Sequence, residues 1–186
     1  MPVTLIRHGH TDCNGPPKVF QGRLDAALSI RGVEEARARG RDLPRPDTIV
    51  SSPALRCRQT LFALLPDTPP EAVRYDERLW EIDVGAWQGR LETEVEATDG
   101  ERLARWRSRP DEQPPGGGES LQAMAGRVRA VVDDLLEEAA AGAHVLAVTH
   151  GGVIRQVRLR VENRPLREFH TFDVSNLTTY QLGRQI

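Results

Sequence analysis

Two short apolar segments, both ending in His-Gly, place the strongest constraint on the fold of this chain. VTLIRHG closes at His8-Gly9, and HVLAVTHG closes at His150-Gly151. Apolar runs of this length, rich in Val, Ile and Leu, are typical of buried strands. If both are strands of one parallel sheet, both imidazoles lie at its carboxyl edge, where open α/β folds bind ligands. We therefore expect the functional site at that edge.

The rest of the chain alternates strand-like and helix-like patterns. Strand-like runs occupy residues 2–7, 47–51, 72–76 and 144–149, with further candidates near 169–174 and 177–182. Helical patterns occupy residues 30–42 with Ser29 as a cap, a segment beginning at Ser52-Pro53, and residues 120–140 with Ser120 as a cap. This alternation predicts an α/β fold, a three-layer α/β/α sandwich with a mainly parallel central sheet.

A length of 186 residues suits one domain. Two segments, at about 12–23 and 97–118, stand outside the alternation, because the first is a Gly- and Pro-containing loop and the second includes the run RPDEQPPGGG. Neither is expected to be a linker, since residues 119–186 alone would hold only part of the sheet. We expect a single domain over residues 1–186, in which these two segments form loops or lids beside the site.

Charge and hydropathy argue against several classes of partner. The 25 basic and 27 acidic residues give a formal charge of −2, which offers no overall attraction to nucleic acid or to an anionic membrane. No apolar run approaches the ~18 residues of a membrane span, and the run before Arg7 is too short for a signal-peptide core. Cys13 and Cys57 lack the spacing of a zinc site or a disulfide framework. We expect a cytoplasmic protein with no nucleic-acid or membrane partner.

A third strand end adds a basic side chain to the predicted edge. The run IVSSPALR ends a strand and places Arg56 in the first turn of the next helix, beside unpaired backbone N–H groups. Arg7, His8, Arg56 and His150 would then converge from three strand ends. Two permanent cations, two titratable rings and oriented amides describe a pocket for a phosphate group.

Five short sequence motifs are distributed along nearly the whole chain. They are, in order, LIRHGHT, SSPALRCRQT, LWEIDVGAWQG, GGGES and VTHGG. In order and spacing they resemble the histidine phosphatase superfamily, which includes cofactor-dependent phosphoglycerate mutases, from about residue 3 to about residue 176. The resemblance implies a phosphoglycerate mutase-like fold.

The resemblance also implies roles for individual residues. His8 would be the nucleophile that becomes phosphorylated, Arg7 and Arg56 would clamp the phosphate, His150 would be the second imidazole of the pocket, and Glu81 would be the proton donor. Positions that line or shape the pocket in relatives correspond here to Asn14, Gln21, Gly22 and the amide of Gly151.

General chemistry supports these roles. Neutral His8 can attack phosphorus, and the two arginines with a protonated His150 would offset the charge of the phosphate oxygens. A carboxyl group beside a phosphate dianion favours its protonated form because like charges disfavour ionisation, so Glu81 could supply the proton of the leaving group. No metal ion or other cofactor is then required.

Other residues compete for these roles or stand apart from them. Asp12, Asp25 and Asp83 are alternative proton donors, and His10 forms a His-x-His pair with His8 that could hint at a metal, although no carboxylate cluster supports one. Residues expected to be structural or exposed are His144, His170 and the arginines at 102, 105, 107 and 109. His10, Cys13 and Ala27 differ from the residues that are most common at these positions in the family. The sequence therefore does not identify the substrate.

We expect a metal-independent phosphomonoesterase that hydrolyses a small phosphorylated metabolite through a phosphohistidine, with broad specificity or like an α-ribazole phosphatase. A cofactor-dependent phosphoglycerate mutase is the alternative within the family. It is disfavoured because the segment after IDVGAWQG is short and because this motif resembles that of the phosphatases more than that of the mutases. A non-catalytic phosphate-binding module is the alternative from another class, disfavoured because His8 and Glu81 are both present. The expected partner is a small-molecule phosphate ester, and a homodimer could form through a late strand at a sheet edge.

Overall fold

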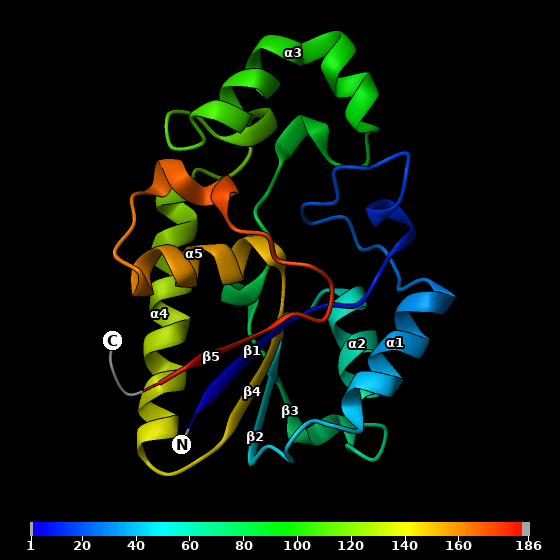
Figure 1. Ribbon diagram of the computed structural model, residues 1–186, viewed down its shortest axis with the longest axis vertical. Helices are drawn as coiled ribbons and strands as arrows, with labels where there is room; N and C mark the ends of the chain where they lie inside the picture. The colour runs from blue at the N-terminus through cyan, green and yellow to red at the C-terminus, as the bar shows by residue number, and fades with distance from the viewer. Residues whose placement is uncertain (1, 184–186) are drawn as a thin grey trace.

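A five-stranded sheet forms the centre of the molecule in the computed structural model, which describes residues 2–183 (Figure 1). Its order is β3-β2-β4-β1-β5. The strands are β1 (Val3–Arg7), β2 (Thr48–Ser51), β3 (Val73–Tyr75), β4 (Val145–Thr149) and β5 (Thr179–Leu182). The first four are parallel, and β5 pairs antiparallel with β1 at the edge. Pairing of a second copy along β5 stays a prediction.

Helices cover both faces of the sheet, as Figure 1 shows. On one side lie α1 (Ile30–Gly40) and α2 (Leu55–Leu64), and on the other α4 (Leu121–Ala140) and α5 (Gly151–Val161). The remaining α-helix, α3 (Glu92–Ser108), arches over the carboxyl edge of the sheet. Short 3-10 turns are η1 (Asp12–Asn14), η2 (Pro70–Ala72), η3 (Glu77–Leu79), η4 (Gly85–Trp87), η5 (Pro115–Gly117) and η6 (Leu166–Thr171). The expected three-layer α/β architecture is confirmed.

The central strands owe their sequence pattern to these two covered faces. Every residue of β4 is buried, because a parallel strand between two helical layers has no solvated face. One apolar cluster joins the sheet to α4, α5 and α3, and a second joins it to α1 and α2. No helix among the described residues is long and apolar enough to cross a membrane.

The register of β1 and β4 fixes where the two histidines lie. Arg7 is paired with Thr149, so His8 and His150 each follow the last paired residue of neighbouring parallel strands. The expected caps of the two best helices are also present: Ser29 accepts the N–H of Gly32, and Ser120 accepts that of Ala123. The apolar periodicity therefore placed both layers correctly.

Two local expectations are wrong. The helix expected at Ser52-Pro53 begins at Leu55, whose N–H donates to Asp25 Oδ1 at 2.7 Å. Residues 169–174 form no strand, because Phe169 and Phe172 are buried with a spacing of three, which is the repeat of the 3-10 helix η6. In the segment 97–118, α3 takes up the residues as far as Ser108, and a role of this segment as a lid stays a prediction.

Candidate active site

The two imidazoles lie against each other at the carboxyl edge of the sheet. Their ring centroids are 5.3 Å apart, with the planes inclined at 65°. Both side chains are buried, and the ring of Trp80 stacks on His150 with centroids 6.3 Å apart. The edge that the sequence singled out therefore brings together residues 142 positions apart in the chain.

The hydrogen bonds of His8 leave one ring nitrogen free. Its Nδ1 lies 2.8 Å from the carbonyl oxygen of Gly9, and a carbonyl only accepts, so Nδ1 carries the proton. Burial, with Arg56 and Arg7 nearby, lowers the pKa of His8 well below its usual value. The ring is thus neutral, and Nε2 presents an unprotonated lone pair.

His150 is held in the opposite tautomer. Arg56 Nη2 lies 3.1 Å from its Nδ1, and a guanidinium only donates, so Nδ1 accepts and Nε2 carries the proton toward Ser52 Oγ at 2.9 Å. Burial and the charge of Arg56 lower the pKa of His150 well below its usual value. A buried ring beside a guanidinium disfavours a second positive charge, so the protonated His150 expected beside a bound phosphate stays a prediction.

The two expected phosphate clamps are cations with no ion-pair partner among residues 2–183, and of the two Arg7 is only half-buried. Arg56 is fully buried and donates to the carbonyl oxygens of Leu24 and Gly22, at 2.6 and 2.8 Å. Arg7 donates to the carbonyl oxygen of Val174, and burial lowers its pKa. The Nε–H groups of both are buried with no hydrogen-bond partner, and neither arginine forms an ion pair within residues 2–183. Burying unpaired charge is costly, so this arrangement favours the binding of an anion.

Glu81 is held at the wall of the site by two backbone amides. Its Oε1 accepts the N–H of Ile82 at 2.9 Å, and its Oε2 accepts that of Gly152 at 3.1 Å. A side chain at position 152 would collide with this carboxylate, since a Cβ there would lie 2.1 Å from Oε1. A carboxylate has about four acceptor positions, so one on each oxygen remains for a proton.

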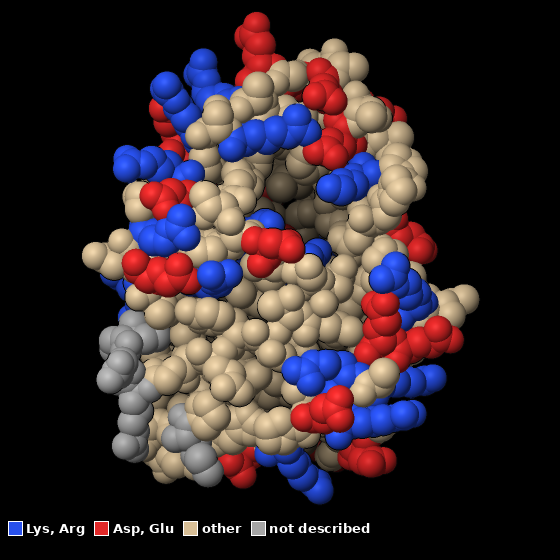
Figure 2. All heavy atoms as spheres, viewed as in Figure 1, with Lys and Arg blue, Asp and Glu red and all other residues tan. Residues whose placement is uncertain are grey.

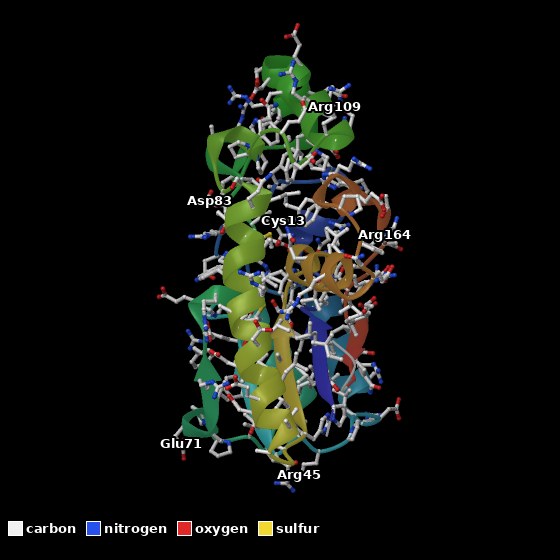
Figure 3. All side chains as sticks on the ribbon, turned by 90° about the vertical axis from the view of Figure 1, so that its left-hand side faces the viewer. Cys13, Arg45, Glu71, Asp83, Arg109 and Arg164 are labelled. Atoms are coloured by element: carbon white, nitrogen blue, oxygen red, sulfur yellow. The ribbon has the colours of Figure 1, made fainter. Side chains whose placement is uncertain are left out.

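These groups line a cavity of about 230 Å³. Figure 2 shows the hollow beneath α3, with basic atoms on its floor. Of the predicted site residues, it is lined by Arg7, His8, Gln21, Gly22, Arg56 and Glu81. Two depressions of about 380 and 450 Å³ lie elsewhere, between α4 and α5 and around Arg45 and Leu64, and neither contains a histidine. Figure 3 shows Arg45 at the end of the molecule opposite Arg109, the residue that follows α3.

The remaining predicted residues surround the cavity without lining it. His150 lies behind Arg56, and Gly151 begins α5, whose amino end faces the site. The Asn14 side chain is taken up by Thr11 and by Asn176, to which its Oδ1 binds at 3.0 and 3.4 Å. Asn14 thus shapes the loop and does not face the cavity.

The alternative proton donors have other partners. Asp83 Oδ1 accepts the N–H of Gly85 at 2.8 Å, and Asp25 accepts that of Leu55. Asp12 is exposed in η1. Within residues 2–183 no group of three or more His, Cys, Asp or Glu is placed to hold a metal ion. Among the described residues, Glu81 is the one carboxylate that lines the cavity.

A brace that sequence reasoning missed holds the segment before Glu81. Arg127 of α4 donates to the carbonyl oxygens of Arg78 and Trp80, both at 2.7 Å, and to that of Glu81 at 3.2 Å. Glu119 pairs with the same guanidinium at 2.6 and 2.7 Å. Glu119 of the GGGES motif thus forms this brace together with Arg127, a role that only the three-dimensional contacts reveal.

The turn after β1 has a second missed support. Asn176 Nδ2 donates to the carbonyl oxygens of His8 and Gly9, at 3.0 and 3.1 Å. Thr60 Oγ1 accepts the N–H of Gly9 at 2.9 Å. Thr60 lies in α2 and Asn176 lies in the segment before β5, so two distant parts of the chain hold the turn that carries the His8 ring.

A family model and several relatives identify the class of protein to which this fold and this site belong. The histidine phosphatase superfamily (branch 1) model matches residues 3–185. The chain belongs to this superfamily, and within it the chain is a phosphatase, a phosphoric monoester hydrolase.

Several relatives share about a third of its residues. The chain is 37% identical over 178 residues to glucosyl-3-phosphoglycerate phosphatase of Mycolicibacterium vanbaalenii, covering 88% of this chain and 77% of that protein. It is 31% identical to phosphoserine phosphatase 1 of Hydrogenobacter thermophilus, covering 94% and 82%. It is also 34% identical to a 2,3-bisphosphoglycerate-dependent phosphoglycerate mutase of Methylobacterium radiotolerans, covering 82% and 75%.

Solved structures show the same likeness. Mycobacterial glucosyl-3-phosphoglycerate phosphatase in complex with VO3 superposes with a TM-score of 0.84 at 33% identity, covering 98% of this chain and 92% of that one. The α-ribazole phosphatase of Shigella flexneri gives a TM-score of 0.85 at 26% identity, covering 100% and 92%. These relatives differ in substrate, so their names do not select one for this chain.

Proposed function

We propose that this phosphatase hydrolyses small phosphate monoesters through a phosphohistidine on His8, with no metal ion. The observation that carries the proposal is the pair of buried guanidiniums, Arg7 and Arg56, whose Nε–H groups lack partners beside the free Nε2 of His8. A phosphate dianion would supply the missing acceptors and the opposite charge.

In the first half-reaction, Nε2 of His8 attacks phosphorus and the bond from phosphorus to the ester oxygen breaks. Arg7 and Arg56 offset the charge on the equatorial oxygens, a preorganised electrostatic effect that is often the largest catalytic contribution. Glu81, having taken up a proton beside the dianion, gives it to the departing alkoxide. The products are an alcohol, phosphohistidine and a Glu81 carboxylate.

In the second half-reaction, a water molecule attacks the phosphohistidine. The Glu81 carboxylate accepts a proton from this water while the bond from phosphorus to Nε2 breaks. Inorganic phosphate leaves, and His8 returns to the neutral form that its surroundings favour. Glu81 is again protonated for the next cycle.

The cavity supports a small substrate. Its volume of about 230 Å³ falls below the roughly 300–1,000 Å³ of pockets for drug-sized ligands. A leaving group of a few heavy atoms would be enclosed, whereas a nucleoside-like group would extend beyond α3. A broad-specificity enzyme and an α-ribazole phosphatase-like enzyme therefore differ in how much of the substrate the cavity holds.

A phosphoglycerate mutase is the second candidate, and the relative from Methylobacterium radiotolerans favours it. A mutase must protect its phosphohistidine from water and hand the phosphoryl group to a second hydroxyl. Interconversion of phosphoglycerates that depends on bisphosphoglycerate and is faster than hydrolysis would establish it.

The test is turnover of 4-nitrophenyl phosphate in EDTA. The wild type should hydrolyse it, and His8→Ala should abolish turnover while His10→Gln, altered at a histidine outside the cavity lining, should retain it. Turnover that requires added metal, or that survives in His8→Ala, would contradict the proposal. Phosphate binding without turnover in the wild type would identify a binding module instead.

A further inference from the structure

The part of the cavity beyond the phosphate groups has a rigid aromatic wall. Trp106 of α3 contacts Phe169 and His170 of η6, with ring centroids 6.0 and 5.0 Å apart, and those two rings lie 5.1 Å from each other. All three residues line the cavity. Desolvation of the His170 ring by its aromatic neighbours, together with the charge of Arg155, lowers the pKa of this otherwise exposed residue to about 4, so the wall carries no charge at neutral pH.

Arg155 places a fixed cation beside this wall. It follows Gly152 by one helical turn in α5 and lines the cavity. Its Nε donates to the carbonyl oxygen of Phe172 at 3.0 Å, and its guanidinium carbon lies 5.6 Å from the ring centroid of Phe169. These contacts with η6 hold the head group in place.

The same helix shows how arginines are otherwise partnered. Arg158 pairs with Glu162 at 3.0 Å, and Arg160 pairs with Asp133 at 2.7 Å. Arg155 forms no ion pair in the part of the chain that the structure describes, and its two terminal nitrogens form no hydrogen bond there. Of the arginines in α5, Arg155 is the one that lines the cavity, and its free donors lie there.

The charges around the cavity do not balance when one phosphate binds. Three arginines line it, Arg7, Arg56 and Arg155, against the single carboxylate of Glu81. A phosphate dianion offsets the first two, and Glu81 offsets none while it holds the proton for the leaving group. The charge of Arg155 then remains unpaired in a partly water-excluded space, which a second anion would relieve.

We propose that Arg155 binds a carboxylate on the leaving group, so that the preferred substrates are phosphate esters of small hydroxy acids. The proposal rests on the proposed function, because it places this carboxylate relative to a phosphate between Arg7 and Arg56. A planar carboxylate matches two parallel N–H donors of a guanidinium fork. The uncharged aromatic wall would enclose the carbon chain between the two anions.

Paired substrates that differ only near the second anion provide the test. D-3-phosphoglycerate carries a carboxylate where glycerol 3-phosphate carries a hydroxymethyl group, and O-phosphoserine carries one that O-phosphoethanolamine lacks. The wild type should show a higher kcat/KM for the acid of each pair, by about 10- to 100-fold, the range of a hydrogen bond to a charged group.

Variants at position 155 separate recognition from packing. Arg155→Gln should lower the ratio of kcat/KM between acid and partner by about 10- to 100-fold, mainly through KM for the acid, and Arg155→Lys should restore part of it. Arg105→Gln, altered at an exposed arginine of α3, should leave the ratio unchanged. An equal loss on both members of a pair in Arg155→Gln would overturn the proposal, since it would show a structural role.

Failure of this inference is distinguishable from failure of the proposed function. If the wild type turns over 4-nitrophenyl phosphate in a His8-dependent way but shows no preference for either acid, the carboxylate site is refuted and the hydrolase stands. If no His8-dependent turnover occurs with any ester, the proposed function itself is refuted. A preference for a nucleoside-like substrate over both acids would also refute the carboxylate site.

Discussion

Gly152 leaves the space that the proton donor occupies, and this predicts a large effect of adding one methyl group. In Gly152→Ala the new Cβ would lie 2.1 Å from Glu81 Oε1, where ordinary contacts begin at 3.4 Å. The carboxylate must therefore retreat by more than about 1 Å, a displacement that can cost on the order of 10²-fold in rate. Complete loss of the general acid would cost about 10²- to 10⁴-fold.

The fold should tolerate this change. The nearest obstacles to the new methyl group are the flexible ends of Glu81 and Met124, not backbone atoms. Alanine is also better than glycine in a helix by up to about 1 kcal/mol. We therefore expect the free energy of unfolding, measured in urea, to change by no more than about 1 kcal/mol.

The assay compares leaving groups that differ in their need for a proton. With glycerol 3-phosphate, an alkoxide must leave, so kcat of Gly152→Ala should fall by about 10²-fold or more. With 4-nitrophenyl phosphate, whose phenolate leaves without help, the first half-reaction should lose much less. Gly126→Ala, where a Cβ meets nothing within 4 Å, should leave both rates unchanged.

A double-mutant cycle makes the reasoning refutable. In an enzyme that already carries Glu81→Ala, adding Gly152→Ala should cost little more, because the methyl group then has no carboxylate to displace. Additive losses in this cycle would show that the methyl group acts elsewhere. Full activity of Gly152→Ala on glycerol 3-phosphate would show that Glu81 does not act from the observed position.

Three further predictions concern stability and reactivity. Folding lowers the pKa of His8 and of His150 well below 6.5, so below pH 6.5 the unfolded chain binds more protons than the folded one. The free energy of unfolding should therefore fall as the pH falls from 7 to 5. Urea titrations should show a shallower fall for His8→Asn than for the wild type. Arg127→Met leaves Glu119 with only its longer ion pair to Arg23, at 3.7 Å, and should lower the free energy of unfolding by up to about 3 kcal/mol. We expect kcat to fall more than KM rises, because Glu81 loses its brace, and unchanged kinetics would contradict that role. Burial raises the pKa of Cys57 to about 12, so this thiol should resist alkylation at pH 8 until the protein unfolds. Rapid labelling of Cys57 in the folded protein, mapped by mass spectrometry, would contradict its burial.

The sequence was sufficient for the layers of the fold because periodic burial determines them. The all-apolar run before His150 needs two covering layers, and the stripe along residues 121–140 supplies one of them. Parallel pairing of the two His-Gly strands then brings the imidazoles together with no further assumption. Short elements were harder to predict, because a run as short as 169–174 contains only one three-residue repeat, from Phe169 to Phe172, to set against a strand pattern.

The protonation and support of the site could not be predicted from the sequence, because they depend on contacts between distant segments. Ser52 stands where the sequence predicts the start of a helix, yet its hydroxyl accepts from His150, 98 residues away. The neutral state of His150 follows from burial beside Arg56, and neither motif alone contains that information. Arg155 lies within an ordinary amphipathic helix, so its role emerges only from the side chains around it.

The most direct test of the account is to trap the phosphorylated enzyme. Rapid quenching into alkali during turnover of a ³²P-labelled ester should yield label on His8, bound to Nε2, since Nδ1 donates to the carbonyl of Gly9. We expect up to one phosphate per chain, and none in His8→Asn. Turnover without a phosphohistidine, or with the label on Nδ1 or on another residue, would contradict the central claim that His8 attacks phosphorus from the observed geometry.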